Sequence, residues 1–243
     1  MGLKNKESIF TDLAGLIAEG WAEELLVKQR LMMPKDRYIK EKTQSLVHDL
    51  EKEHEKNLLY MERARELLFL ALENLSGEEK EQYTKELLIA TEKLSQNIEM
   101  EQITEDTPWQ KILGLSDATL IWIYKLGFHF FEQKNNEDAL SLFLLLSMLN
   151  PLASDYWIAL GFAQKELSLE SLALTSFSLA ASLDPENPTP NYQSAEIYIQ
   201  LGLLDQAVLE VQTLAKIIER QKLDFLKPDL ENLLNRIQNS KLS

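Results

Sequence analysis

Apolar residues recur at intervals of three and four along almost the whole chain, the spacing that places them on one face of an α-helix. Segments that alternate apolar and polar residues, as a half-buried β-strand does, are missing. Only eight glycines and seven prolines interrupt the 243 residues. The pattern therefore predicts an all-α protein.

The N-terminal domain, residues 1–107, is predicted to be a helical arm. Pro34 separates its first two helices, and Ser76 followed by Gly77 separates the second from the third. The second and third helices carry long apolar stripes that need partners, so we expect them to form a hairpin. The three helices are expected over about residues 7–31, 35–75 and 77–100, and the segment QITEDTP, ending at Pro108, marks the domain boundary.

The second domain, residues 108–243, repeats itself from Leu120 onward with a period of 34 residues. This is the spacing of the tetratricopeptide repeat, a pair of helices (A and B) that pack closely through small residues. The aligned positions include Gly127, Gly161 and Ala195; Ala139, Ala173 and Ala207; and Phe143, Phe177 and Val211. We predict repeats over 120–153, 154–187 and 188–221, arranged as a short right-handed superhelix, and a capping helix over about 224–240.

The middle repeat fits the known pattern almost completely, from Trp157 to Pro185, with Gln164 in place of the usual Tyr. The flanking repeats are looser, because Ile123 and Asn191 replace the Trp.

The repeat framework accounts for one face of each A helix, yet the opposite face is apolar as well. In a repeat array this second face lines the concave groove, and each large side chain buried there is worth roughly 1.5 to 3 kcal/mol. We expect the groove to bind an extended or short helical peptide. The alternative is that the N-terminal arm folds back and fills it. The predicted groove residues are Tyr124, Phe128, Phe131, Ile158, Phe162, Tyr192, Glu196 and Ile199.

The net charge of −14 and the pI near 4.8 argue against a nucleic-acid partner or an anionic membrane surface, because both need a basic surface. The longest uncharged run, residues 139–154, is shorter than the ~20 residues that span a bilayer, so no membrane insertion is expected. The first ten residues lack the apolar segment of an export signal. The absence of cysteine excludes disulfides and thiol catalysis, and a cytoplasmic location is expected.

Catalytic and metal-binding motifs are scarce, so we expect neither an enzyme nor a cofactor. Glu51 and His54 have the Glu-x-x-His spacing of di-iron bundles, but the second such motif that a metal site needs does not occur. Nucleotide-binding glycine loops are also missing. Lys165 is the one prominent base near the predicted groove, which argues against a site for a peptide carboxylate, and we expect it at the groove rim with Glu166.

The repeats resemble the translocator chaperones of bacterial type III secretion, the SycD/LcrH family, over about residues 115–240. The resemblance is carried by the aromatic first A helix and by segments that occur in the same order as in the family. These are Tyr124, Phe128 and Phe131; Leu160 and Gly161; Pro190, Tyr192, Ala195 and Glu196; and Leu201, Gly202, Leu204 and Asp205.

The resemblance implies a cytoplasmic bacterial chaperone that shields a secreted, membrane-active client by gripping a short segment containing proline and leucine. Family members use a short N-terminal extension to dimerise, so a homodimer through the N-terminal helices is a further expectation. The arm of more than a hundred residues departs from the family. The alternative function is a tetratricopeptide-repeat adaptor or regulatory scaffold in which the arm makes the main contact.

Overall fold

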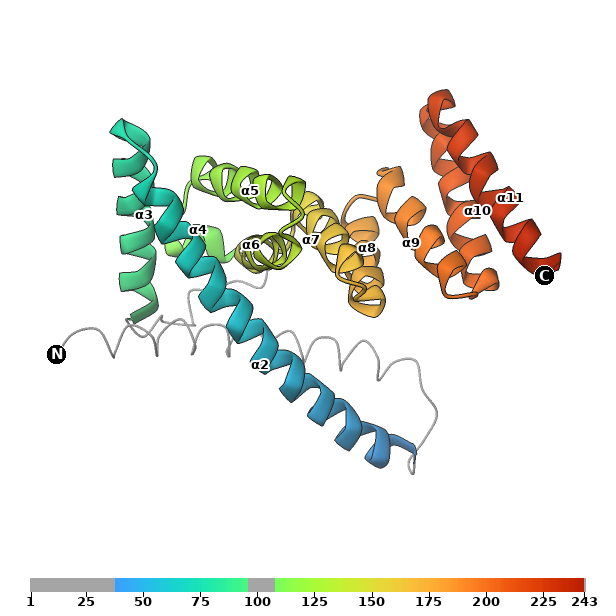
Figure 1. Ribbon diagram of the computed structural model, residues 1–243, viewed down its shortest axis with the longest axis horizontal. Helices are drawn as coiled ribbons and strands as arrows, with labels where there is room; N and C mark the ends of the chain where they lie inside the picture. Colours follow the sequence, from blue (N-terminus) through green and yellow to red (C-terminus); the bar gives the residue numbers. More distant parts are fainter. Residues whose placement is uncertain (1–37, 96–107, 243) are drawn as a thin grey trace. The chain divides into compact units, whose positions relative to one another are not determined.

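The computed structural model describes residues 38–95 and 108–242, with the side chains of residues 56–93 and 108–240 (Figure 1). These residues form helices joined by short connections, and no β-strand occurs among them. The predicted all-α class is confirmed, whereas the helix expected over residues 7–31 lies outside the described residues. The chain divides into two compact units, Met1–Gly127 and Phe128–Ser243.

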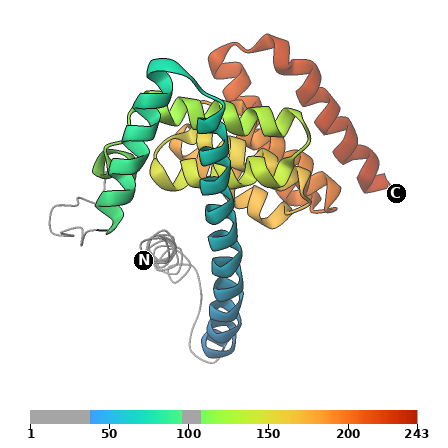
Figure 2. The same ribbon diagram turned by 60° about the vertical axis from the view of Figure 1, so that its left-hand side comes forward.

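In the first unit, α2 (Tyr38–Glu73) and α3 (Gly77–Ser95) are two consecutive helices joined by a short turn, as expected for a hairpin. Figure 2 shows α2 as one continuous helix. The turn between them needs a left-handed residue, and Gly77 supplies it with φ of 71°. Met61, Ala64, Leu68 and Leu72 of α2 are buried at the predicted spacing of three and four, and Leu67 beside them is buried as well.

A short helix that the sequence did not predict, α4 (Trp109–Leu113), precedes α5 (Asp117–Glu132). Helix α3 is fixed to the start of α5 by the carboxylate of Glu86. It accepts hydrogen bonds from the Ser116 amide at 2.8 Å and from the Thr119 hydroxyl at 2.5 Å. Tyr83 and Trp122 stack beside this network with ring centroids 4.9 Å apart.

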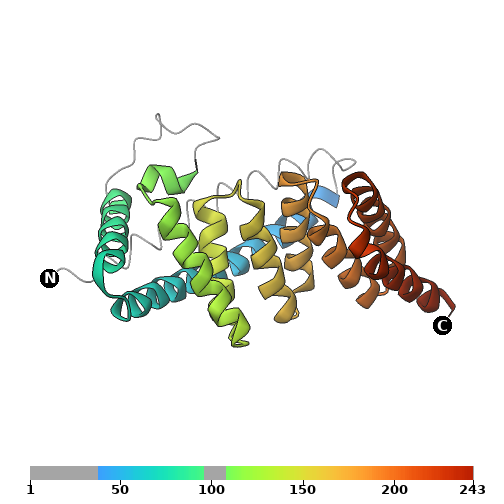
Figure 3. The ribbon, with the colours of Figure 1, turned by 90° about the horizontal axis from the view of Figure 1, so that it is seen from above.

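The second unit takes in the end of α5 and the helices after it, and from α6 onward each helix packs on the next (Figure 3). Their bounds follow the predicted 34-residue copies. The helices are α6 (Asn136–Leu149), α7 (Ser154–Glu166), α8 (Glu170–Leu183), α9 (Pro188–Gln200), α10 (Leu204–Gln221) and α11 (Lys227–Leu242), with a 3₁₀ turn, η2 (Asp224–Leu226), before the last.

The period of the sequence is also visible in the backbone of the turns that follow the A helices. Each turn contains a left-handed residue: Lys134, Ser168 and Gly202, with φ of 63°, 56° and 72°. In each turn the next amide bonds back to the carbonyl five residues earlier at 2.9 Å, as Leu169 does to Gln164. This is the Schellman closure of a helix, and only the third copy uses the glycine that it favours.

Substitutions within the repeat pattern are compensated by hydrogen bonds. Gln164, which replaces Tyr, is buried and accepts a hydrogen bond from the Ser176 hydroxyl at 2.7 Å. Asn191, which replaces Trp, is also buried and donates to the Glu210 carboxylate at 2.8 Å. Both polar side chains therefore remain paired in the interior.

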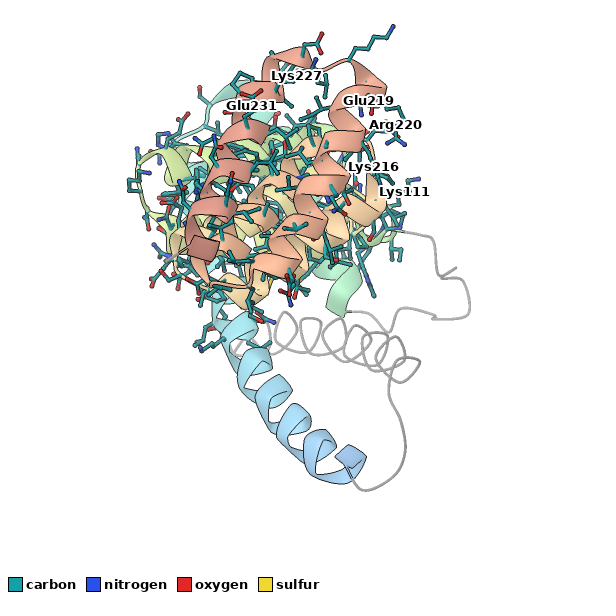
Figure 4. The ribbon with its side chains drawn as sticks, turned by 90° about the vertical axis from the view of Figure 1, so that its right-hand side faces the viewer. Lys111, Lys216, Glu219, Arg220, Lys227 and Glu231 are labelled. Carbon is teal, nitrogen blue, oxygen red and sulfur yellow. The ribbon has the colours of Figure 1, made fainter. Side chains whose placement is uncertain are left out.

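The last helix, α11, covers the apolar face of the third repeat. Leu233 and Ile237 are buried in one cluster with Ala195, Val211 and Leu214. The outer side of this end of the molecule is charged, as a capping element requires for solubility. Figure 4 shows its side chains: Lys216, Glu219 and Arg220 on α10, and Lys227 and Glu231 on α11.

Candidate functional site

The aromatic residues predicted for the first A helix contact one another and the helix that follows. Phe128 packs edge-on against Phe131, with centroids 6.5 Å apart, and against Phe143 of α6 at 5.6 Å. Phe128 is nevertheless 39% exposed. Tyr124, half-buried, lies one turn ahead of Phe128 on the same helix, and Ile121, before it, is exposed. This helix therefore combines anchored aromatic rings with accessible apolar surface.

On the second A helix, Ile158 and Phe162 are half-buried and lie one turn apart. Phe162 contacts the fully buried Phe177 of α8 edge-on, with centroids 5.6 Å apart. The backbone of α7 approaches Phe177 so closely that a Cβ on Gly161 would lie 2.7 Å from its ring. Gly161 thus allows the close helix contact that positions Phe162.

On the third A helix, Tyr192, Glu196 and Ile199 are half-buried. Tyr192 and Ile199 pack against the apolar cluster of the third repeat. Burial raises the pKa of Tyr192, and the nearby charges of Glu196 and Asp229 raise it further. The phenol is therefore neutral at physiological pH.

Glu196 lies at the centre of a network that joins three helices. Lys165 of α7 donates to Oε2 of Glu196 at 2.8 Å and to Oε1 of Gln193 at 2.6 Å, and Arg236 of α11 donates to Oε1 of Glu196 at 3.1 Å. Burial alone would raise the pKa of Glu196. The hydrogen bonds and charges of Lys165 and Arg236 outweigh burial, so this pKa lies below its ordinary value of 4.5.

The sequence did not predict this network. Lys165 was expected beside Glu166, but it reaches across to α9 instead, and Glu166 lies 3.8 Å from Lys134. The one sequence feature that pointed to it was Glu196, a glutamate among otherwise apolar groove positions. Arg236, 40 residues away in the capping helix, gave no signal.

The eight predicted residues thus occupy the three A helices, where they take part in different sets of contacts. Phe128 contacts both Phe131 and Phe143, Phe162 joins the cluster around Phe177, and Tyr192 and Ile199 lie on the third-repeat core. The Lys165–Glu196 pair connects the second A helix with the third. The binding role of these residues stays a prediction from the sequence.

Within the described part of the chain, no group of His, Asp and Glu residues has the arrangement of a metal site. The side chains of Glu51 and His54 lie outside it. The described helices include none long and apolar enough to cross a membrane.

About half of the chain is similar to type III secretion chaperones of known structure, although no family model matches. The low calcium response locus protein H of Yersinia pseudotuberculosis is 28% identical over 123 residues, which cover 51% of this chain and 70% of the relative. The structure of PcrH in complex with the chaperone-binding region of PopD is 30% identical, with a TM-score of 0.50, and covers 53% of this chain and 97% of PcrH.

The fold is also that of the type III secretion translocator chaperone SycD of Yersinia enterocolitica. Its structure is 22% identical, with a TM-score of 0.50, and the match covers 55% of this chain and 98% of SycD. These matches agree with the three-repeat architecture, and they leave almost half of the chain without a counterpart.

Proposed function

Because the chain belongs, over about half of its length, to the SycD/LcrH family of type III secretion translocator chaperones, we propose that it binds a secreted client before export. The client is membrane-active and translocator-like, and it is held in the bacterial cytoplasm through a peptide segment. The observation that carries this proposal is the likeness to PcrH, whose structure contains the chaperone-binding region of PopD. The relatives are chaperones, and we propose no catalytic role for this chain.

We assign binding to the second face of the A helices, where apolar side chains are anchored but accessible. The residues are Tyr124, Phe128, Phe131, Ile158, Phe162, Tyr192, Glu196 and Ile199. A client segment that covers them removes its own apolar surface from water together with theirs, which opposes aggregation and premature membrane insertion. The edge-on contacts of Phe128 and Phe162 with buried rings support this assignment, because fixed side chains lose little conformational freedom on binding.

The proposal is tested by capture from the native host with the tagged full chain. We expect the wild-type chain to retain a secreted protein with hydrophobic segments, and the Phe128→Ala/Phe162→Ala variant to lose it. Leu209→Ala is the matched control, because Leu209 is 63% exposed on α10, outside the predicted groove. Circular dichroism checks that all variants are folded. Equal capture by the groove variant and the wild type would refute the assignment.

A second function, as an adaptor that binds through the N-terminal arm, is supported by exposed apolar residues in the first unit. Leu59 and Leu70 lie on α2 and Leu88 on α3, and each is more than half exposed. A Leu70→Ser/Leu88→Ser variant separates the two functions. Loss of the captured protein in this variant, with full capture by the groove variant, would favour the adaptor.

A further inference from the structure

A pocket of about 290 Å³ lies at the N-terminal end of α9, and of the predicted groove residues it shares only Tyr192. Its walls come from four elements of the third repeat and the cap: α9, α10, η2 and α11. Leu214 of α10 is almost fully buried, and Leu226 packs against the same apolar cluster. The residues that matter here are Thr189, Tyr192, Gln193, Leu214, Leu226 and Asp229.

The walls of this pocket are held in place by contacts that the structure defines. The Thr189 amide donates to Oδ1 of Asn187 at 3.0 Å, which caps the start of α9. Oε1 of Gln193 accepts the hydrogen bond from Lys165 at 2.6 Å. The Tyr192 ring packs on the core. The cavity is therefore preorganised, which lowers the entropy lost when a ligand binds.

The volume limits what the pocket can hold. At about 290 Å³ it lies just below the range of sites for drug-sized ligands, so it suits one or two side chains rather than a folded partner. Leu214, Leu226 and the ring of Tyr192 make much of its lining apolar. A lining of this size and polarity suits an aliphatic side chain.

The charges around the pocket add a second requirement. Asp229, an exposed residue of the lining, forms no hydrogen bond or ion pair with any residue that the structure describes. The neighbouring carboxylate, Glu196, already has Lys165 and Arg236 as partners. Asp229 is thus the carboxylate left to pair with a cation from a bound peptide.

We propose that this pocket binds an aliphatic side chain of leucine size from the client segment, and that a lysine or arginine directly after it pairs with Asp229. The inference rests on the proposed function, because the client supplies the segment. It extends client recognition from the A helices onto the capping helix. It also adds a sequence rule, an aliphatic residue followed by a basic one.

The test uses the full chain with ¹³C-labelled leucine methyl groups and the probe peptide acetyl-Ser-Leu-Lys-Ser-amide. We expect saturable shifts of the Leu214 and Leu226 methyl signals. Asp229→Lys should weaken binding about fivefold, the effect of one exposed ion pair. Glu231→Lys is the matched control, because it makes the same charge change two residues along α11, away from the pocket lining, and should bind as the wild type does.

Two further peptides test each half of the rule. Acetyl-Ser-Ala-Lys-Ser-amide lacks the aliphatic side chain, and acetyl-Ser-Leu-Glu-Ser-amide reverses the charge, so both should bind more weakly. Unshifted Leu214 and Leu226 signals, or equal affinity for the Leu-Lys and Leu-Glu peptides, would overturn the proposal. If Asp229→Lys unfolds, Asp229→Asn replaces it.

The outcome is independent of the test of the groove. In the Phe128→Ala/Phe162→Ala variant the probe peptide should still shift the Leu214 and Leu226 signals, because neither substituted residue lines the pocket. Peptide shifts together with client capture that Asp229→Lys leaves unchanged would mean that the pocket plays no part in client binding, which would overturn the proposal. Absent shifts with normal client capture would refute the pocket and leave the proposed function standing.

Discussion

Lys165 on α7 and Glu196 on α9 form an ion pair of 2.8 Å, and the second oxygen of the same carboxylate is held by Arg236 of α11 at 3.1 Å. One side chain thereby joins the second repeat, the third repeat and the cap. Both Lys165 and Glu196 are only 20% exposed, so solvent screens their interaction less than it screens a surface pair. The network is both a structural joint and the polar part of the proposed binding face.

Glu196→Gln should lower the free energy of unfolding at about pH 7 by about 1 to 2 kcal/mol, because two charge-assisted hydrogen bonds are weakened. The folded-state pKa of Glu196 lies below 4.5, so its contribution is present above that pH and is lost as the pH falls through the folded value. Urea unfolding at several pH values measures this. A difference between variant and wild type that does not shrink as the pH falls below 4.5 would contradict the account.

Glu210→Gln should have the opposite effect. Burial raises the pKa of Glu210 and the hydrogen bond from Asn191 only partly offsets it, so the charged form is disfavoured in the folded chain. The wild-type chain gains stability from this group as the pH falls through its folded pKa toward 4.5. The variant should therefore be more stable by about 0.5 to 1 kcal/mol at about pH 7, as measured by urea unfolding. Glu219→Gln, exposed on the same helix, should change nothing.

Ser168→Gly should stabilise the chain by about 0.5 to 1 kcal/mol, because Ser168 has φ of 56° in a turn where the third repeat has Gly202. Gly202→Ala makes the opposite change in the third repeat. The new Cβ would meet nothing within 4 Å, so any loss of stability comes from backbone strain alone. Thermal unfolding measures both. A destabilised Ser168→Gly chain would show that the serine side chain outweighs the strain.

Gly161→Ala should destabilise the chain by about 1 to 3 kcal/mol through overlap with the Phe177 ring, although alanine favours helices. With Phe177→Leu added, the double variant should lose less than the sum of the two single variants, because the smaller side chain makes room for the new methyl group. Denaturant unfolding of the two single variants and the double variant gives the coupling energy. Additive effects would mean that the ring does not meet the new methyl group.

The repeat period could be predicted because it comes from local requirements that recur every 34 residues. Ala173 and Gly161 must be small where helices meet, and the helix bounds follow from that register. The left-handed turns at Lys134 and Ser168 escaped prediction, because the sequence marks such a turn only where glycine stands, as at Gly202.

The polar contacts between elements were the part that sequence reasoning missed. Glu86 bonds to Ser116 across 30 residues, and Arg236 to Glu196 across 40, and no spacing rule links such positions. The short helix α4 was also missed, since five residues give too little pattern to recognise. Phe128 and Phe162 could be predicted as groove residues because the repeat pattern does not require large apolar side chains at their positions.

The central claim is that the second face of the A helices holds the client. It is tested most directly by calorimetric titration of the full chain with a client segment, namely the segment of the captured client that the bound chain protects from proteolysis. The Phe128→Ala/Phe162→Ala chain should bind this segment at least about tenfold more weakly than the wild type, while Leu209→Ala and Leu70→Ser/Leu88→Ser bind it unchanged. Unchanged affinity in the Phe128→Ala/Phe162→Ala chain, with loss in Leu70→Ser/Leu88→Ser, would contradict the claim.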